Sequence, residues 1–347
     1  MKPDDTSASA ARTCLALFSG GLDSVVAVKL MLDQGINVIA LHFVTPFFSG
    51  RYRADRAEPT IEKLCGTLGV ELRVVAFGLE YLEILRNPRH GMGKNFNPCL
   101  DCRIAFLRRA AELMGPLGAD WLITGEVLGQ RPMSQRRDAM HIVERESGLR
   151  GYLLRPLCAA LLEPTVPEQR GWVDRSRLLS ITGRGRKQQF ELTGQWGIEG
   201  FANPAGGCLL TDPNHARKTR YLLEHQQRIT LDDLELLKRG RHFMLGAGVH
   251  LVVARNDREN QMIEALEQAA DWELDPQNFP GPLAVIRGEP SAEQLELAAQ
   301  IVLRYGNAGR STGPPRVLAC NVGGERRELD PGALPEDLDD LLEPLRL

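Results

Sequence analysis

The stretch Cys14-Leu-Ala-Leu-Phe-Ser-Gly-Gly-Leu-Asp-Ser24 decides the fold of the first half of the chain. Its apolar start predicts a buried strand, and residues 22–34 carry apolar side chains at helical spacing. Gly20 and Gly21 lie between the two. A buried strand needs no Gly-Gly pair at its end, so the pair serves either a tight turn or the close approach of a ligand to the backbone.

The segments that follow repeat this alternation of strand and helix. We predict strands at 37–44 and 71–77 with a helix at 59–68 between them, and two further strands at 121–124 and 152–156. Such alternation indicates an α/β fold, a doubly wound parallel sheet with helices on both faces. Ligands of these sheets bind beyond the carboxyl ends of the strands, so the glycine turn lies where a ligand would bind.

Composition narrows the class of protein. The chain has 347 residues, of which 43% are hydrophobic, and this length predicts two domains. No apolar run is long enough for a membrane helix, and residues 1–12 lack the hydrophobic centre of a secretory signal, so we expect a cytoplasmic location and no membrane partner. Although the net charge is -3, residues 131–220 carry 15 Lys or Arg against 9 Asp or Glu. This local excess fits either a phosphate-binding face or ordinary surface scatter.

The pattern of predicted strands and helices changes near residue 230, where we expect a second, smaller α+β domain. Its predicted elements are strands at 250–254, 283–286 and 316–322, helices at 259–270 and 292–305, and a solvated acidic helix at 330–343. The expected organisation is a disordered N-terminus (1–12), an α/β domain (13–160), a helical Arg-rich extension (161–229) and the smaller domain (230–347).

The glycine turn has the features of a phosphate site. Backbone N–H groups of Ser19, Gly20 and Gly21 precede a helix N-terminus, which attracts anions through its free donors and its dipole. The turn lacks the Gly-Lys-Ser or Gly-Lys-Thr ending of common ATPase loops. It resembles instead the Ser-Gly-Gly-x-Asp-Ser signature of the PP-loop ATP pyrophosphatases, and it matches every fixed position.

This resemblance implies a reaction and a set of binding residues. PP-loop enzymes adenylate a substrate oxygen and split ATP into AMP and pyrophosphate, with Mg²⁺ neutralising the phosphates. The implied role of Asp23 is catalytic as well as nucleotide-binding, as a metal ligand or base. The nucleotide-binding residues implied are Ser19, Gly20, Gly21, Asp23 and Ser24 of the turn, His42 and Phe43 of the second strand near the adenine, and Gly125.

The cysteines bear on which atom the enzyme transfers. Seven cysteines, an odd number in a long chain, do not indicate a disulfide framework. In the segment from Asn97 to Arg103 we expect Asn97 to cap a helix and Pro98 to occupy its first position, so that Cys99 and Cys102 share one face of the helix start, where thiolates are favoured. Taken alone, this is equally the pattern of two half-buried thiols or a redox pair.

A third cysteine, Cys208, follows Asn203-Pro-Ala-Gly-Gly and repeats the Asn-Pro element. Three thiolates suit an iron–sulfur cluster with one open iron, or a zinc site with one open position. The other cysteines are expected to be packing residues, because free Cys is among the residue types most often buried. They are Cys14, Cys65, Cys158 and Cys320.

The segment Thr124-Gly-Glu-Val-Leu-Gly-Gln130 resembles the corresponding part of the 4-thiouridine synthetases, the tRNA-thiolating members of the PP-loop family. In cluster-dependent thiolases a Cys-x-x-Cys pair and a distant Cys hold a 4Fe-4S cluster whose unique iron carries the incoming sulfide. The resemblance implies these catalytic and metal-binding roles for Cys99, Cys102 and Cys208. We find neither the THUMP domain nor the rhodanese domain of such synthetases, which leaves the target nucleotide open.

The smaller domain is similar, more weakly, to the RNA-binding domain of the NFACT proteins, in residues 250–260 and 279–286. The alternative is a structural or dimerisation domain. Basic residues of the middle region, among them Arg184, Arg186 and Lys187, are expected to hold tRNA phosphates and present a flipped uridine.

Together these features predict an ATP-dependent tRNA uridine thiolase, whose partners are tRNA and a sulfur donor, either sulfide or a persulfide protein. Three alternatives stay open. The thiols could pass a persulfide without any cluster, or the chain could be an RNA-binding or ribosome-associated adaptor with a regulatory nucleotide loop. The third alternative is a nitrogen-transferring ligase, which would give the thiols no role. The sequence is also compatible with a homodimer and leaves a small-molecule substrate open.

Overall fold

A computed structural model describes residues 12–48, 58–201, 207–321 and 323–347 of the chain. The chain divides into two compact units, Met1–Gly207 and Cys208–Leu347. The helical extension expected at 161–229 is therefore shared between the two units. Most of the N-terminal segment expected to be disordered, and residues 203–206 ahead of Cys208, lie outside the described residues. No described helix is both long enough and apolar enough to span a membrane.

The first unit contains a five-stranded sheet in the order β3-β2-β1-β4-β5, in which every pair of neighbours runs parallel. This confirms the α/β fold predicted from the alternating pattern. Its strands are β1 (Thr13–Leu17), β2 (Asn37–Val44), β3 (Glu71–Ala76), β4 (Trp121–Thr124) and β5 (Leu153–Leu154).

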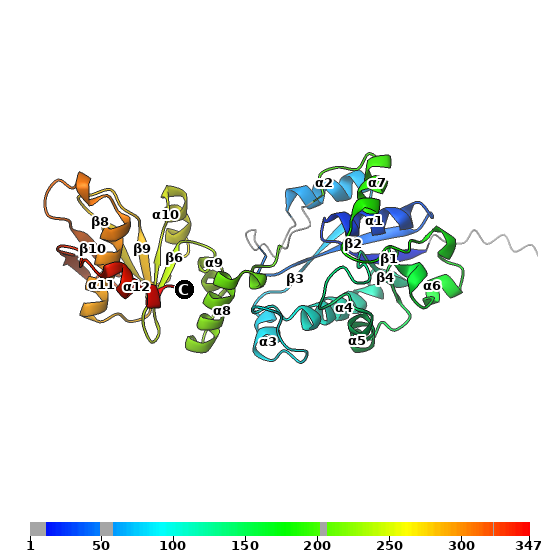
Figure 1. The fold of residues 1–347 in the computed structure, drawn as a ribbon, viewed down its shortest axis with the longest axis horizontal. Helices are drawn as coiled ribbons and strands as arrows, with labels where there is room; N and C mark the ends of the chain where they lie inside the picture. Colours follow the sequence, from blue (N-terminus) through cyan, green and yellow to red (C-terminus); the bar gives the residue numbers. More distant parts are fainter. Residues whose placement is uncertain (1–11, 49–57, 202–206, 322) are drawn as a thin grey trace, which may run out of the picture. The chain divides into compact units, whose positions relative to one another are not determined.

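Helices cover both faces of this sheet. Figure 1 shows α1 and α2 on one side and α3, α4 and α5 on the other. The α-helices are α1 (Leu22–Leu32), α2 (Pro59–Leu68), α3 (Tyr81–Arg86), α4 (Cys99–Met114), α5 (Arg137–Ser147), α6 (Val166–Gln169) and α7 (Lys187–Gln195). Two short 3-10 helices, Ala159–Leu161 and Arg175–Arg177, lie between α5 and α7.

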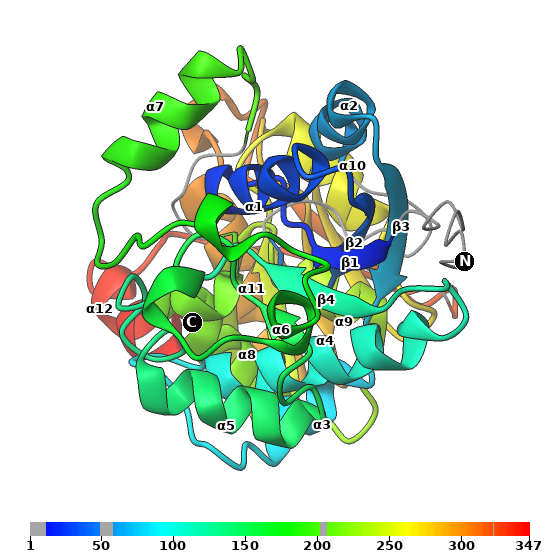
Figure 2. The ribbon, with the colours of Figure 1, turned by 90° about the vertical axis from the view of Figure 1, so that its right-hand side faces the viewer.

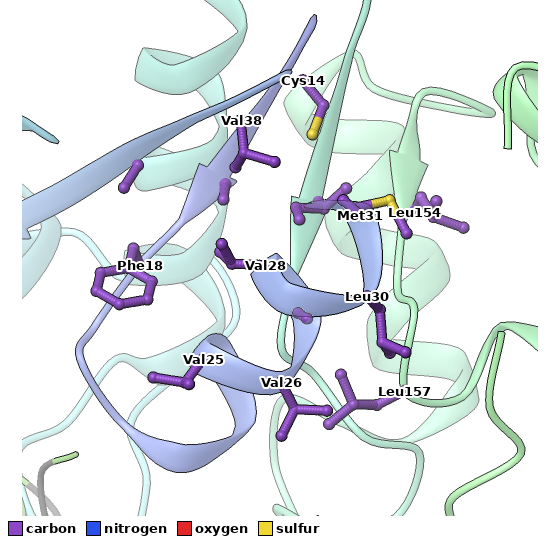
Figure 3. Packing of buried hydrophobic residues seen from close by; sticks show 14 of the residues in the cluster. Cys14, Phe18, Val25, Val26, Val28, Leu30, Met31, Val38, Leu154 and Leu157 are labelled. Carbon is purple, nitrogen blue, oxygen red and sulfur yellow. The ribbon is translucent and has the colours of Figure 1, made fainter. Parts of the chain in front are cut away.

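The core of the first unit forms around α1. Val25, Val26 and Met31 of this helix are fully buried, and they pack in one cluster with Cys14 of β1 and Leu157 beyond β5 (Figure 3). Because the helix is apolar on nearly every side, it lies beneath other elements rather than on the surface. Its N-terminus, which follows the glycine turn, is thereby held against the carboxyl end of β1.

The second unit contains a six-stranded antiparallel sheet in the order β11-β10-β8-β9-β7-β6. Its strands are β6 (Arg241–Gly246), β7 (Val249–Val253), β8 (Trp272–Pro276), β9 (Ala284–Arg287), β10 (Val317–Asn321) and β11 (Arg326–Leu329). Its helices are α8 (Pro213–His225), α9 (Leu231–Leu236), α10 (Asp257–Glu264), α11 (Ala292–Tyr305) and α12 (Leu338–Leu342), with 3-10 helices at Leu209–Thr211, Ala308–Arg310 and Glu343–Leu345.

The expected helix over residues 330–343 was wrong in most of its length. Only α12 forms, and it is not wholly solvated, because Leu338 and Leu342 are buried in the core of the second unit. Pro331 and Pro335 precede this helix. Proline removes a backbone donor and clashes with a preceding helical turn, so the acidic composition did not translate into a continuous helix.

Candidate functional site

The glycine turn joins β1 to the N-terminus of α1, as its sequence predicts. Gly20 has φ of +70°, and a Cβ atom there would lie 2.8 Å from Ile61 Cγ1, so both the backbone and the space require glycine. The Ser24 hydroxyl donates to the Gly21 carbonyl (2.7 Å) and lies 3.4 Å from the Ser19 hydroxyl. Two hydroxyls and a helix N-terminus therefore converge on one turn, a geometry that favours an anion.

Asp23 is held by side chains from two distant parts of the chain. Gln130 Nε2 donates to one carboxylate oxygen (2.8 Å), and Gln189 Nε2 of α7 donates to the other (3.2 Å). The Arg186 guanidinium forms an ion pair with Asp23 (3.7 Å). These contacts fix the carboxylate at the rim of the turn and bring the segment after β4 and the start of α7 beside it.

Gly125, directly after β4, lies against the backbone of α1. A Cβ atom at this position would be 2.5 Å from the Asp23 carbonyl carbon and 2.6 Å from the Ser24 nitrogen. No side chain fits there without displacing the backbone, so glycine is what allows β4 to approach the turn. The structure thus brings Gly125 beside Asp23 and Ser24.

His42 and Phe43 of β2 point in different directions. His42 is buried, and its Nδ1–H donates to the Phe18 carbonyl (3.0 Å) just ahead of the glycine turn. Burial lowers the pKa of His42 and keeps its imidazole neutral. The Phe43 ring instead stacks on Phe106 of α4 with 4.7 Å between ring centroids. The roles of both residues toward adenine stay predictions.

Helix α4 begins at Cys99, one residue later than predicted. Its N-cap is Pro98, with ψ of 62°, and Asn97 does not cap the helix. The buried Asn97 amide donates to the Cys99 sulfur (3.0 Å) instead. Cys99 and Cys102 are both half-buried on the first turn of the helix, as the spacing indicated. The correction arises because the side chain that was expected to satisfy backbone donors turns toward a thiol.

A buried network of charges joins the thiol helix to the segment after β4. Glu126 pairs with Arg155 (3.0 Å) and with Arg103 of α4 (3.1 Å), and Arg155 also pairs with Glu144 of α5. Burial alone would raise the pKa of Glu126, but the two guanidinium groups outweigh it and hold that pKa below its ordinary value. Arg103 directly follows Cys102, so the network sets the position of the thiol pair relative to Gly125 and Gln130.

The remaining cysteines separate into buried and partly exposed positions. Cys14, Cys65 and Cys158 are buried, and burial raises the pKa of all three, that of Cys65 and of Cys158 to about 11. Cys320 on β10 is only half-buried. Cys208 is the first residue of the second unit and is also half-buried.

The metal site predicted for Cys99, Cys102 and Cys208 stays a prediction. Among the residues that the structure describes, no three His, Cys, Asp or Glu side chains are grouped as metal ligands. Cys99 and Cys102 share a helical turn in the first unit, whereas Cys208 belongs to the second.

Sequence reasoning missed the contacts of Gln189 and Arg186 with Asp23. Both residues lie more than 160 positions after Asp23 in the chain, and a glutamine in an amphipathic helix gives no signal of its own. Gln130 belongs to a motif quoted for its resemblance, but its partner could not be read from that motif. Gln189 is recognised only in the structure, where it is fully buried in a helix otherwise rich in polar residues.

The sheet and glycine turn place the first unit in the PP-loop class of α/β nucleotide-binding domains. More narrowly, residues 9–163 match the family model described as thiamine biosynthesis protein (ThiI), and residues 240–333 match that of the NFACT protein RNA binding domain. The chain therefore combines a ThiI-type PP-loop domain with an NFACT-type domain.

Several curated proteins resemble the first unit. A probable tRNA sulfurtransferase from Thermococcus kodakarensis is 28% identical over 148 residues, covering 41% of this chain and 36% of that protein. Another from Methanothermobacter thermautotrophicus is 32% identical over 121 residues, covering 33% of this chain and 29% of that protein. A tRNA-specific 2-thiouridylase from Micrococcus luteus is 30% identical over 160 residues, covering 42% of this chain and 41% of that protein. The chain thus spans about a third of the length of the first two relatives.

Among solved structures, a 4-thiouridine synthetase in complex with RNA and ATP aligns with a TM-score of 0.40 and 20% identity, covering 65% of this chain and 52% of that one. The C-terminal part of a fibronectin/fibrinogen-binding protein from Streptococcus suis aligns with a TM-score of 0.27 and 13% identity, covering 72% of this chain and 90% of that one.

Proposed function

We propose that this protein is an ATP-dependent tRNA sulfurtransferase that replaces a uridine carbonyl oxygen with sulfur. The observation that carries the proposal is the connection between two sites in one ThiI-type domain. The glycine turn contacts the segment after β4 through Gly125 and Gln130, and that same segment holds the thiol helix through Glu126 and Arg103. A nucleotide loop and a thiol pair joined in this way support coupled adenylation and sulfur transfer.

The glycine turn would bind ATP. Amides and hydroxyls at Ser19 to Ser24 would receive the phosphates, and Mg²⁺ would neutralise charge there with Asp23 within reach as a ligand. The uridine carbonyl oxygen attacks the α-phosphorus, the bond to the β-phosphate oxygen breaks, and pyrophosphate leaves. The oxygen, now joined to AMP, has become a good leaving group.

The cysteines would deliver the sulfur. A sulfur nucleophile attacks the activated carbon, and AMP leaves with the former carbonyl oxygen. Three half-buried cysteines, Cys99, Cys102 and Cys208, are the donor set that would hold a 4Fe-4S cluster, and such a cluster supplies a sulfur-binding iron when one position is left without a protein ligand.

A cluster-free persulfide relay is the second candidate for this step. The terminal sulfur of a persulfide on one cysteine attacks the activated carbon, and AMP leaves. A neighbouring thiolate then attacks the sulfur of that cysteine, the S–S bond breaks, thiouridine is released and the two cysteines form a disulfide. The spacing of Cys99 and Cys102 on one helical turn favours such an exchange. The disulfide would have to be reduced by a thiol reductant before the next cycle.

The NFACT-type unit supports RNA as the substrate class. We therefore propose tRNA as a partner. A sulfur donor is the second proposed partner, and the proposed place of action is the cytoplasm. The contrasting function, an RNA-binding adaptor with a regulatory nucleotide loop, predicts RNA binding without release of AMP.

The test is an anaerobic assay with unmodified tRNA, ATP, Mg²⁺ and sulfide. We expect thiouridine in the nuclease digest and AMP with pyrophosphate in equal amounts. With a cluster held by the three cysteines, Cys208→Ser should abolish thiouridine, whereas Cys320→Ser, also at a half-buried cysteine, should not. RNA binding by the wild type with neither AMP nor thiouridine, when tested with persulfide as well as sulfide, would instead establish the adaptor.

Iron analysis of the same protein separates the two sulfur steps. About four irons per chain, lost when Cys99, Cys102 and Cys208 are all changed to Ser, would establish the cluster. Thiolation by an iron-free protein that carries a persulfide detectable by mass spectrometry would establish the relay.

A further inference from the structure

Helix α7 carries an exposed aromatic side chain that the proposed reaction does not use. Phe190 is 49% exposed, and of the large exposed hydrophobic residues in the described chain only Phe190 and Tyr152 are aromatic. A single exposed hydrophobic residue is ordinary and needs no explanation. The surroundings of Phe190 are what distinguish it.

The opposite face of α7 fixes this helix beside the candidate nucleotide site. Gln189 is fully buried and donates to Asp23, and Thr193 one turn later is 2% exposed. Figure 2 shows α7 outside α1, at the edge of the first unit. The exposed face of α7 is therefore held at the rim of the turn that would bind ATP. Phe190 directly follows Gln189, which donates to Asp23 of that turn.

Two exposed cations precede the ring in the sequence. Arg184 is exposed, and the Lys187 side chain, three residues before Phe190 and on the same helical face, is 90% exposed. The ion pair of Lys187 with Glu191 is long at 3.8 Å and open to solvent, so it holds the ammonium group weakly. Arg186, between the two cations, is turned toward Asp23 instead.

We propose that Arg184, Lys187 and Phe190, here called the α7 ridge, bind an unpaired nucleotide of RNA, with the ring stacked on the base and the two cations on its phosphates. This inference rests on the proposed function and names the surface that presents the substrate. Aromatic rings flanked by cations are the usual surface for single-stranded RNA. An apolar protein partner would need further exposed hydrophobic residues beside the ring. Phe201, whose ring centroid lies 6.0 Å from that of Phe190, is partly buried, and the exposed residues next to Phe190 in sequence are Lys187, Gln188 and Glu191.

The test compares the affinity of full-length variants for unmodified tRNA. Phe190→Ala should weaken binding roughly tenfold, and Phe190→Trp should restore it, because stacking needs only an aromatic face. Tyr152→Ala, at the other exposed aromatic residue of the first unit, is the matched control and should bind as the wild type does. Lys187→Gln should make the plot of log affinity against log salt concentration less steep, by about the slope of one phosphate contact.

The affinity for ATP should stay the same in all four variants, and circular dichroism should confirm their fold. Equal binding of tRNA by Phe190→Ala and Tyr152→Ala would overturn the inference, and so would a loss confined to transfer from a sulfur-donor protein. The proposed function fails by a different result, namely a wild type that binds tRNA and makes no thiouridine from either sulfide or persulfide.

Discussion

Gly125 shows how one missing Cβ atom determines the approach of two elements. In the proposed reaction we expect Gly125→Ala to reduce kcat/KM for ATP about a hundredfold, because the methyl group would displace the Asp23 backbone and with it the groups that position ATP. Gly66→Ala is the control, since a Cβ atom there meets open space. Steady-state release of pyrophosphate measures both variants, and equal rates would contradict the close approach of β4 to α1.

The three buried cysteines allow a second prediction at this scale. Burial raises the pKa of Cys65 and Cys158 to about 11 and that of Cys14 as well, so few thiolates form at neutral pH. We expect iodoacetamide to label Cys99 in the native, iron-free protein and to leave these three unlabelled until urea is added. Peptide mass spectrometry gives the result, and rapid native labelling of Cys158 would count against its burial.

At the scale of elements, Glu126 joins α4, α5 and the segment after β4. We expect Glu126→Gln to lower the free energy of unfolding by about 3–5 kcal/mol, because Arg155 would keep a buried charge with one partner lost. Glu112→Gln removes a solvent-exposed pair with Arg109 on α4 and should cost about 1 kcal/mol or less. Urea unfolding compares them, and similar midpoints would mean that the network contributes little.

Elements could be predicted from sequence where burial imposes a regular spacing of apolar side chains. Helices such as α1 and α11 and the parallel strands have apolar side chains at regular spacing, and the sequence sufficed for them. The strands β6, β8 and β11 were missed. Arg326, Arg327 and Glu328 are exposed on the edge strand β11. The interior strand β8 has five residues, in which Glu273 and Asp275 interrupt the apolar side chains. For the candidate site, local sequence placed the turn and the thiols, whereas the partners of Asp23 depend on folding of the whole unit.

At the scale of the molecule, the two units differ in their buried histidines. His42 is the buried histidine of the first unit, while His215, His242 and His250 are buried in the second. His250 Nε2–H donates to His242 Nδ1 (2.9 Å), and His242 Nε2–H donates to the Arg239 carbonyl (2.5 Å), so a proton added to His242 would place two donors against each other. Burial lowers the pKa of all three, that of His215 and of His250 to about 3.

These shifts set the direction of a pH dependence. Above the unfolded pKa of about 6.5 the histidines are neutral in both states, and below it only the unfolded chain gains protons. The stability of the second unit should therefore fall as pH decreases from about 6.5 toward 3, by at most about 1.4 kcal/mol per pH unit for each histidine. Hydrogen exchange followed by mass spectrometry should lose protection in the second unit before the first.

Two variants sharpen this test. His250→Gln should make the acid dependence shallower, because one fewer buried imidazole must stay neutral, whereas His225→Gln at an exposed position should leave it unchanged. Protection that falls in both units at the same pH would show that the histidine cluster does not control acid stability.

The Glu126 network also constrains how this protein could change over generations. Glu126 and Arg155 are the buried members of this network, and replacing any one of Arg103, Glu126, Glu144 and Arg155 leaves a buried charge with one partner fewer. Drift at these positions would have to proceed by compensated steps, with two or more codons altered together. A mutagenesis library meant to retune the proposed activity should therefore vary the four positions jointly or leave all of them fixed.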